Sequence, residues 1–221
     1  MFNFNLDQLP MYLMRIPVLL IALSFHEAAH GYAAYKLGDY TAKITGRLSL
    51  NPLRHLDPVG AICMFLFGFG WAKPVPIDTR NFKNQKIGMS LSALAGPVVN
   101  LILGFIGMFF YLLAGRFIGM AAYNGSNFAY AVLLFLRVFY SLNIGLAVFN
   151  LLPVPPLDGS RIFLVFLPTK WYFKVMQYER YIMLGMFALI FLGVLDRPLG
   201  WLINIVTSGM YMILNLLPFL H

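Results

Sequence analysis

Three long apolar runs constrain the fold of this chain more than any other feature. They cover residues 11–35, 87–115 and 128–152, and each is longer than the roughly 20 helical residues that cross a bilayer. The chain is 60% hydrophobic and only 11% charged, whereas soluble domains average about 25% charged residues. The sequence therefore predicts a membrane protein with several spanning helices.

The remaining apolar segments complete the expected architecture. Two further helices are predicted over residues 181–195 and 199–219, which gives an all-α polytopic membrane protein with about five transmembrane helices. The run at 59–71, with about 13 residues, is too short for a regular span, so we expect a re-entrant or β-hairpin element there. We expect one domain over residues 1–221, with a core at approximately 11–160 and additional C-terminal membrane helices at approximately 178–220.

The basic residues indicate how the chain is oriented. The net charge is +8, but no basic stripe lies on a soluble unit, so nucleic acid is not an expected partner. Eight Lys and Arg lie in 36–86 and four in 161–180, which is twelve of the 16 in the chain. Because cytoplasmic loops are enriched in Lys and Arg, both loops are predicted to face the cytoplasm. We expect a multi-pass protein of a prokaryotic cytoplasmic (inner) membrane.

The first apolar run contains three polar side chains that hydrophobic packing does not explain. His26 and His30 are four residues apart, so on a helix both imidazoles lie on one face and can reach one metal ion. Glu27 lies beside them, which completes the pattern H-E-x-x-H of zinc metallopeptidases. A catalytic zinc ion usually has three protein ligands, so this motif requires a third ligand from elsewhere in the chain.

Asp158 is the candidate for that third ligand. Three prolines within residues 153–156 end the third long helix and leave Asp158 on extended backbone. A carboxylate at membrane depth is costly unless it is paired or bound to a metal. On the predicted topology, Asp158 and the C-terminal half of the first helix approach from the same, cytoplasmic side.

The motifs together resemble the site-2 protease family of intramembrane zinc metalloproteases. The resemblance covers roughly residues 20–160 and rests on His-Glu-x-x-His, on Gly96-Pro97 with Asn100, and on Asn150-x-x-Pro-x-Pro-x-Leu-Asp-Gly. It implies one zinc ion held by His26, His30 and Asp158, with Glu27 as the catalytic base. It also implies membrane-protein or signal-peptide-like substrates cleaved within the lipid bilayer. The chain is similar to compact members, since it shows no room for a PDZ domain and no CBS pair.

Three further residues are candidates for substrate or oxyanion contacts. By the resemblance, Asn150 would assist at the reacting carbonyl or position the substrate. Asn100 and His55 are the others, although Asn100 also suits an interhelical hydrogen bond and His55 suits a structural or capping role. A metal or proton transporter and a catalytically idle, chaperone-like relative remain alternatives. The first usually shows repeat symmetry, which we do not find, and the second is expected to lose Glu27.

Overall fold

The computed structural model describes residues 9–60 and 72–218, and within these residues it forms helices and no named strand. The predicted all-α class is therefore confirmed for the described part of the chain. The longer helices are α1 (Leu9–Lys36), α4 (Gln85–Tyr123), α5 (Asn127–Asn150), α8 (Glu179–Phe191) and α9 (Asp196–Leu214). The shorter ones are α2 (Thr41–Ile44), η2 (Pro52–Arg54), η3 (Thr79–Asn81), α6 (Asp158–Leu164) and α7 (Thr169–Gln177).

Three described helices, α1, α4 and α5, are long and apolar enough to cross a membrane. With its 39 residues, α4 is about 58 Å long at 1.5 Å per residue, so it must tilt or extend beyond the hydrocarbon. The pair α8 and α9 is bent by 86° and counts as a fourth span only if it is taken as one broken helix. The protein is thus a multi-pass membrane protein, and the predicted count of about five spans is not confirmed.

Helix boundaries differ from the prediction in two polar regions. The expected loop after residue 115 is helical as far as Tyr123, because α4 continues through Arg116. The expected polar connection at 170–180 contains α7, whose first and last residues are Thr169 and Gln177. The predicted re-entrant or β-hairpin element at 59–71 lies almost entirely outside the described residues, which resume at Ala72.

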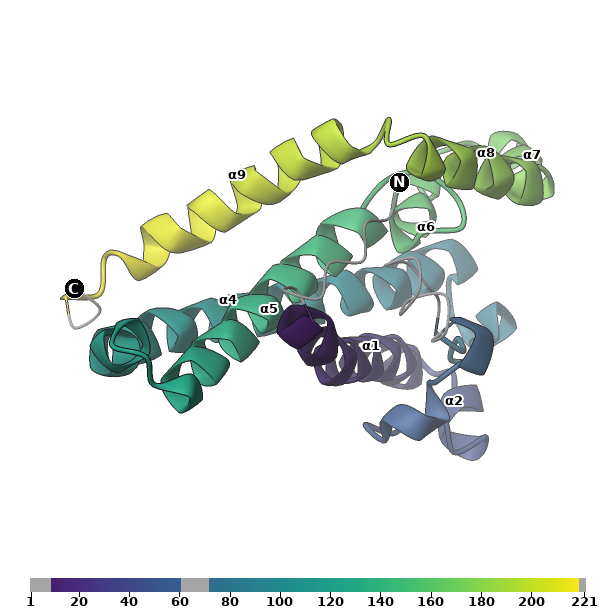
Figure 1. Ribbon diagram of the computed structural model, residues 1–221. Helices are drawn as coiled ribbons and strands as arrows, with labels where there is room; N and C mark the ends of the chain where they lie inside the picture. Colours follow the sequence, from purple (N-terminus) through teal and green to yellow (C-terminus); the bar gives the residue numbers. More distant parts are fainter. Residues whose placement is uncertain (1–8, 61–71, 219–221) are drawn as a thin grey trace.

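The long helix α4 is the element on which the others assemble. It packs most extensively against α5 and then against α1, and it also contacts α6 (Figure 1). Helix α9 packs against α5 and, less extensively, against α4, and the three helices share a buried apolar cluster of Met108, Ile144, Val148 and Leu214. Through α4, residues of α1 and α6 that are more than a hundred positions apart in sequence are brought together.

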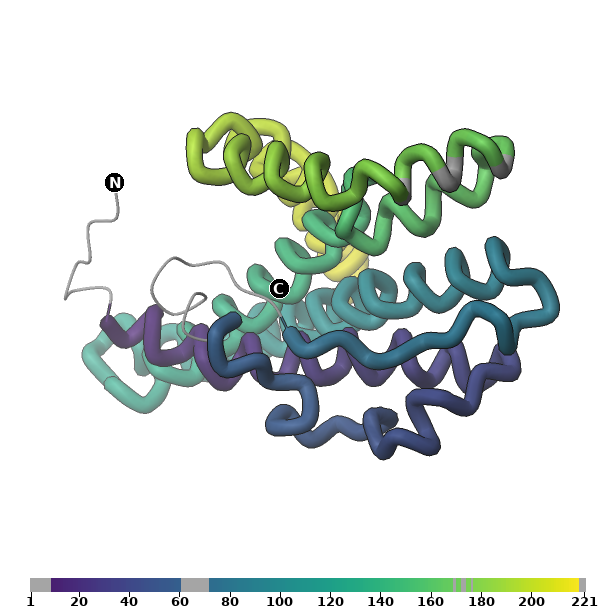
Figure 2. The backbone as a smooth tube through the Cα atoms, turned by 90° about the vertical axis from the view of Figure 1, so that its right-hand side faces the viewer, coloured from purple at the N-terminus to yellow at the C-terminus, as the bar shows by residue number. Residues whose placement is uncertain are grey.

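Residues 37–60, which follow α1, run back beside that helix (Figure 2). Residues 72–78, which we call the strap, then follow the C-terminal half of α1 in extended conformation. Asp39, which is fully buried, fixes the end of the strap by accepting hydrogen bonds from the Asp78 backbone N–H and the Asn81 amide, both at 2.8 Å. The position of the strap matters because it lies against the helix that carries H-E-x-x-H.

Candidate metal centre and active site

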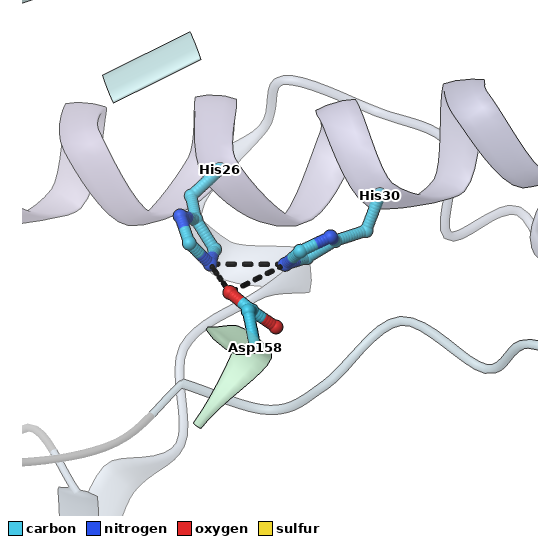
Figure 3. Close-up of side chains that lie close together, drawn as sticks. All are labelled: His26, His30 and Asp158. Carbon is cyan, nitrogen blue, oxygen red and sulfur yellow. Dashed lines mark hydrogen bonds and ion pairs between the residues drawn. The ribbon is translucent and has the colours of Figure 1, made fainter. Parts of the chain in front are cut away.

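The two histidines of the motif point to one another from the same face of α1. Their Nε2 atoms are 2.9 Å apart, and both rings are buried, His26 to 5% and His30 to 8% exposure. Asp158, the first residue of α6, extends its Oδ2 between them, at 3.0 Å from Nε2 of His26 and 3.3 Å from Nε2 of His30 (Figure 3). The three side chains named from the sequence therefore form one cluster.

A backbone carbonyl of α4 sets the tautomer of His30. Nδ1 of His30 lies 2.8 Å from the carbonyl oxygen of Ser92, and a carbonyl can only accept, so Nδ1 carries the proton and donates it. In the neutral ring Nε2 then has a free lone pair, which faces Asp158 and His26. The Ser92 hydroxyl in turn donates to the carbonyl of His30 at 3.0 Å, so α1 and α4 are tied together at this position.

The cluster fits a zinc ion. One ligand atom from each of His26, His30 and Asp158 lies within 4.8 Å of the others. A tetrahedral zinc with bonds of about 2.0–2.1 Å separates its ligand atoms by roughly 3.3–3.4 Å, close to the three spacings of 2.9, 3.0 and 3.3 Å. Oδ2 of Asp158 is buried and makes no hydrogen bond within the described residues. A cation between these electron-rich atoms satisfies all of them at once.

Gly96 of α4 leaves the space that the two imidazole rings occupy. A Cβ atom at this position would lie 2.5 Å from Cε1 and Nε2 of His30 and 2.6 Å from Cε1 of His26. Carbon atoms in contact are normally 3.5–4.0 Å apart, so no larger residue fits here without moving the rings. The close approach of α4 to α1 at the metal centre thus depends on a glycine.

Glu27 lies next to the cluster and contacts the strap. Its Oε2 accepts a hydrogen bond of 2.8 Å from the backbone N–H of Val75. No hydrogen bond to Oε1 is formed within the described residues, so this oxygen is available to accept a proton. The carboxylate is therefore held at one oxygen and open at the other, which suits a general base.

The three other predicted site residues make contacts of a different kind. Nε2 of His55, which is 2% exposed, lies 2.6 Å from the Ser49 carbonyl, and Asn150 donates to Leu146 of its own helix at 3.0 Å. Asn100 is fully buried, and both polar atoms of its side chain lack a hydrogen-bond partner in the described part of the chain. None of these contacts joins them to His26, His30 or Asp158.

Two contributors to the site were not predicted from the sequence. The carbonyl of Ser92 acts through the backbone, and residue identity carries no signal for a backbone acceptor. The N–H of Val75 could have been singled out, because Pro74 and Pro76 have no N–H and Val75 is thus the one donor among these three residues.

Comparison with known proteins finds relatives with zinc metalloprotease names. The sequence profile of Peptidase family M50 matches residues 112–193. YwhC of Bacillus subtilis, which carries a zinc metalloprotease name, is 44% identical over 193 residues, covering 86% of this chain and 84% of that protein. Rip2 of Mycobacterium tuberculosis, also named as a zinc metalloprotease, is 30% identical over 152 residues, covering 67% of this chain and 55% of that protein.

A more distant relative comes from an archaeon. The zinc metalloprotease MJ0392 of Methanocaldococcus jannaschii is 29% identical over 154 residues, which is 70% of this chain and 34% of that protein. No solved structure matches the chain significantly.

Proposed function

Because the chain belongs to peptidase family M50, the site-2 proteases, and is a zinc metalloprotease, we propose that its active site is the cluster of His26, His30 and Asp158 with Glu27. The observation that carries this proposal is the convergence of Oδ2 of Asp158 on the Nε2 atoms of both histidines. Membership in a peptidase family does not support the transporter alternative. The presence of Glu27 argues against a catalytically idle, chaperone-like protein.

In this mechanism His26, His30 and Asp158 hold the zinc ion. When bound, zinc supplies a Lewis acid that acidifies water and polarises a peptide carbonyl. Oε1 of Glu27 accepts a proton from the attacking water as its oxygen forms a bond to the peptide carbon. Glu27 then returns the proton to the amine nitrogen as the C–N bond breaks, so the carboxylate is regenerated.

Two backbone groups beside the cluster determine where His30 carries its proton and which oxygen of Glu27 can accept one. The Ser92 carbonyl keeps the His30 proton on Nδ1 and Nε2 free for the metal. The Val75 N–H occupies Oε2 of Glu27, so proton transfer is assigned to Oε1. Asn150, Asn100 and His55 stay candidates for substrate or oxyanion contacts. Asn100 is favoured, because its amide is fully buried and has no hydrogen-bond partner in the described part of the chain.

We place the substrate in the membrane. The chain is a multi-pass membrane protein, and α1, which carries both histidines, is itself a candidate span. The substrates are membrane proteins or signal-peptide-like segments, cut in or near their transmembrane part after local unwinding. The concentration of basic residues in 36–86 and 161–180 supports an active site that faces the cytoplasm. The core at 11–160 contains every proposed site residue, within one domain over 1–221.

One experiment tests the assignment of roles. Purified protein in liposomes is given a single-pass substrate, and cleavage and bound zinc are measured for wild type, Glu27→Gln and Asp158→Asn. We expect Glu27→Gln to lose cleavage by at least about 100-fold while it keeps zinc, and Asp158→Asn to lose both. Retained cleavage in Glu27→Gln would exclude Glu27 as the base, and wild-type zinc binding in Asp158→Asn would exclude Asp158 as a ligand.

A further inference from the structure

The peptide group between Pro74 and Val75 joins the active site to a cation outside it. Its N–H donates to Oε2 of Glu27 at 2.8 Å. On the carbonyl side, a guanidinium nitrogen of Arg47, Nη2, lies 2.6 Å from the carbonyl oxygen of Lys73 and 3.2 Å from that of Pro74. One planar peptide group thus has a guanidinium at its oxygen and a carboxylate at its hydrogen.

This arrangement is favourable for both charges. The C=O and N–H of a trans peptide point in opposite directions along one dipole, so a cation at the oxygen and an anion at the hydrogen both stabilise it. Hydrogen bonds in such a chain strengthen one another. Arg47 therefore acts on the orientation of the Glu27 carboxylate although the two side chains are separated by the peptide.

Arg47 also fixes where that peptide group lies. Its other terminal nitrogen, Nη1, donates to the carbonyl of Arg54 at the end of η2, so one guanidinium bridges η2 and the strap. The planar fork of a guanidinium presents several donors in fixed directions, which the single ammonium of a lysine does not. The Lys73 N–H donates to the carbonyl of His55 at 2.8 Å and completes this junction.

The strap has little freedom to move between its two ends. Val75 is 7% exposed, and a Cβ atom on Gly31 of α1 would lie only 3.1 Å from Cγ1 of Val75. Asp39 holds the far end through the N–H of Asp78. The strap is thus seated on α1 at the turn that follows Glu27, with Arg47 at one end and Asp39 at the other.

We propose that Arg47 is a positioning residue for Glu27, acting through the Pro74–Val75 peptide group. It holds the plane of that peptide so that the Val75 N–H keeps Oε2 of Glu27 in place and leaves Oε1 for the proton. This inference rests on the proposed role of Glu27 as general base. Arg47 touches neither the metal ligands nor the reacting atoms, so its loss affects proton transfer and leaves zinc binding intact.

The test compares Arg47→Lys and Arg47→Gln with Arg54→Lys as the matched control. Arg54 is seven residues from Arg47, but its guanidinium donates to the Gly46 carbonyl, and its side chain makes no hydrogen bond to the strap among the described residues. For each variant, kcat and KM are measured on a single-pass substrate in liposomes, and bound zinc is quantified. Hydrogen exchange of the strap is measured on the same proteins.

We expect both Arg47 variants to lower kcat by roughly 10–100-fold, because a misplacement of about 1 Å at a catalytic group can cost 100-fold. KM and zinc content stay within about twofold of wild type, and the Val75 amide exchanges faster. Arg54→Lys keeps wild-type kcat and wild-type exchange at Val75. If Arg47 only held residues 47–54 and the strap together, kcat would not fall while KM stayed unchanged.

Three results would overturn the assignment. The first is a wild-type kcat in both Arg47 variants. The second is a loss of zinc or of folding in both, since Arg47 would then support the whole site and not Glu27 alone. The third is exchange of the Val75 amide in both variants that stays as slow as in wild type. Glu27→Gln in the same assay keeps the two proposals apart. If this variant retains cleavage, the role of Glu27 as general base fails. Slow exchange at Val75 in the Arg47 variants would instead refute the link between Arg47 and the Val75 N–H.

Discussion

The substitution Gly96→Ala tests whether the close approach of α4 to α1 creates the metal centre. The added Cβ would lie 2.5 Å from two atoms of the His30 ring and 2.6 Å from Cε1 of His26. Because normal carbon contacts are 3.5–4.0 Å, the rings or the helices must separate by about 1 Å. Zinc sites tolerate deviations of only about 0.2 Å in ligand distance.

We therefore expect Gly96→Ala to weaken zinc binding by at least roughly 100-fold, or about 2.7 kcal/mol. Competition with a fluorescent chelator measures the affinity of the detergent-solubilised protein. Two glycines of the same helix serve as controls. Gly104→Ala places a Cβ 2.7 Å from Cγ1 of Ile144, so it should cost about 1–3 kcal/mol of stability without loss of zinc. Gly115→Ala meets no atom of the described residues within 4 Å, so it should leave zinc binding intact and should keep or improve stability.

The outcome that contradicts this reasoning is a wild-type zinc affinity in Gly96→Ala. An equal loss of zinc in Gly104→Ala would also contradict it, because the effect would then follow from general loosening of α4. The comparison thus separates contact with the ligands from helix packing.

Two further predictions concern residues that support the site. Ser92→Ala removes the hydrogen bond from the Ser92 hydroxyl to the His30 carbonyl but keeps the backbone carbonyl that accepts from Nδ1. Zinc affinity should therefore change less than about threefold, while the free energy of unfolding, measured in detergent, should fall by about 1 kcal/mol. Burial would raise the pKa of Asp39, but hydrogen bonds from Thr41, Asn81 and the Asp78 N–H hold it below its usual value. The stabilisation from Asp39 is therefore present above about pH 4 and lost as the pH falls through the lowered pKa; a stability curve of Asp39→Asn that still shows this acid loss would refute the assignment.

The spanning helices and the cluster of His26, His30 and Asp158 were predictable because the physical requirements of each are local. A bilayer demands about 20 apolar residues in a row, and α1 and α5 begin and end within two residues of the predicted limits. His26 and His30 share a helix face by their spacing alone, and three prolines before Asp158 indicate the break that frees it. Each of these inferences needed only a short window of sequence.

The polar segments were predicted less well, because tertiary contacts decide their structure. The stretch after residue 115 contains Arg116 and Gly119 among apolar residues, and it continues α4 as far as Tyr123. Helix formation is cooperative, so a helix that is already long extends at little cost through residues of moderate propensity. The contacts of Ser92 and Arg47 depend on backbone groups of distant segments, which no pattern of side chains encodes. Pro74 and Pro76 single out Val75 as a donor, but they do not indicate Glu27 as its partner.

One side of α4 shows that a sequence pattern can indicate a packing surface without indicating the partners that it packs against. Small and polar residues recur along one side of this helix, because Gly96, Asn100 and Gly104 are spaced four residues apart, as in a stripe that packs against other helices. The structure assigns different partners to successive positions: Ser92 and Gly96 meet His30 of α1, while Gly104 meets Ile144 of α5. Asn100 lies between these two contacts, fully buried and unpaired within the described residues. The stripe therefore contacts the proposed metal ligand His30 at one end and forms part of the α4–α5 interface at the other, with Asn100 between the two.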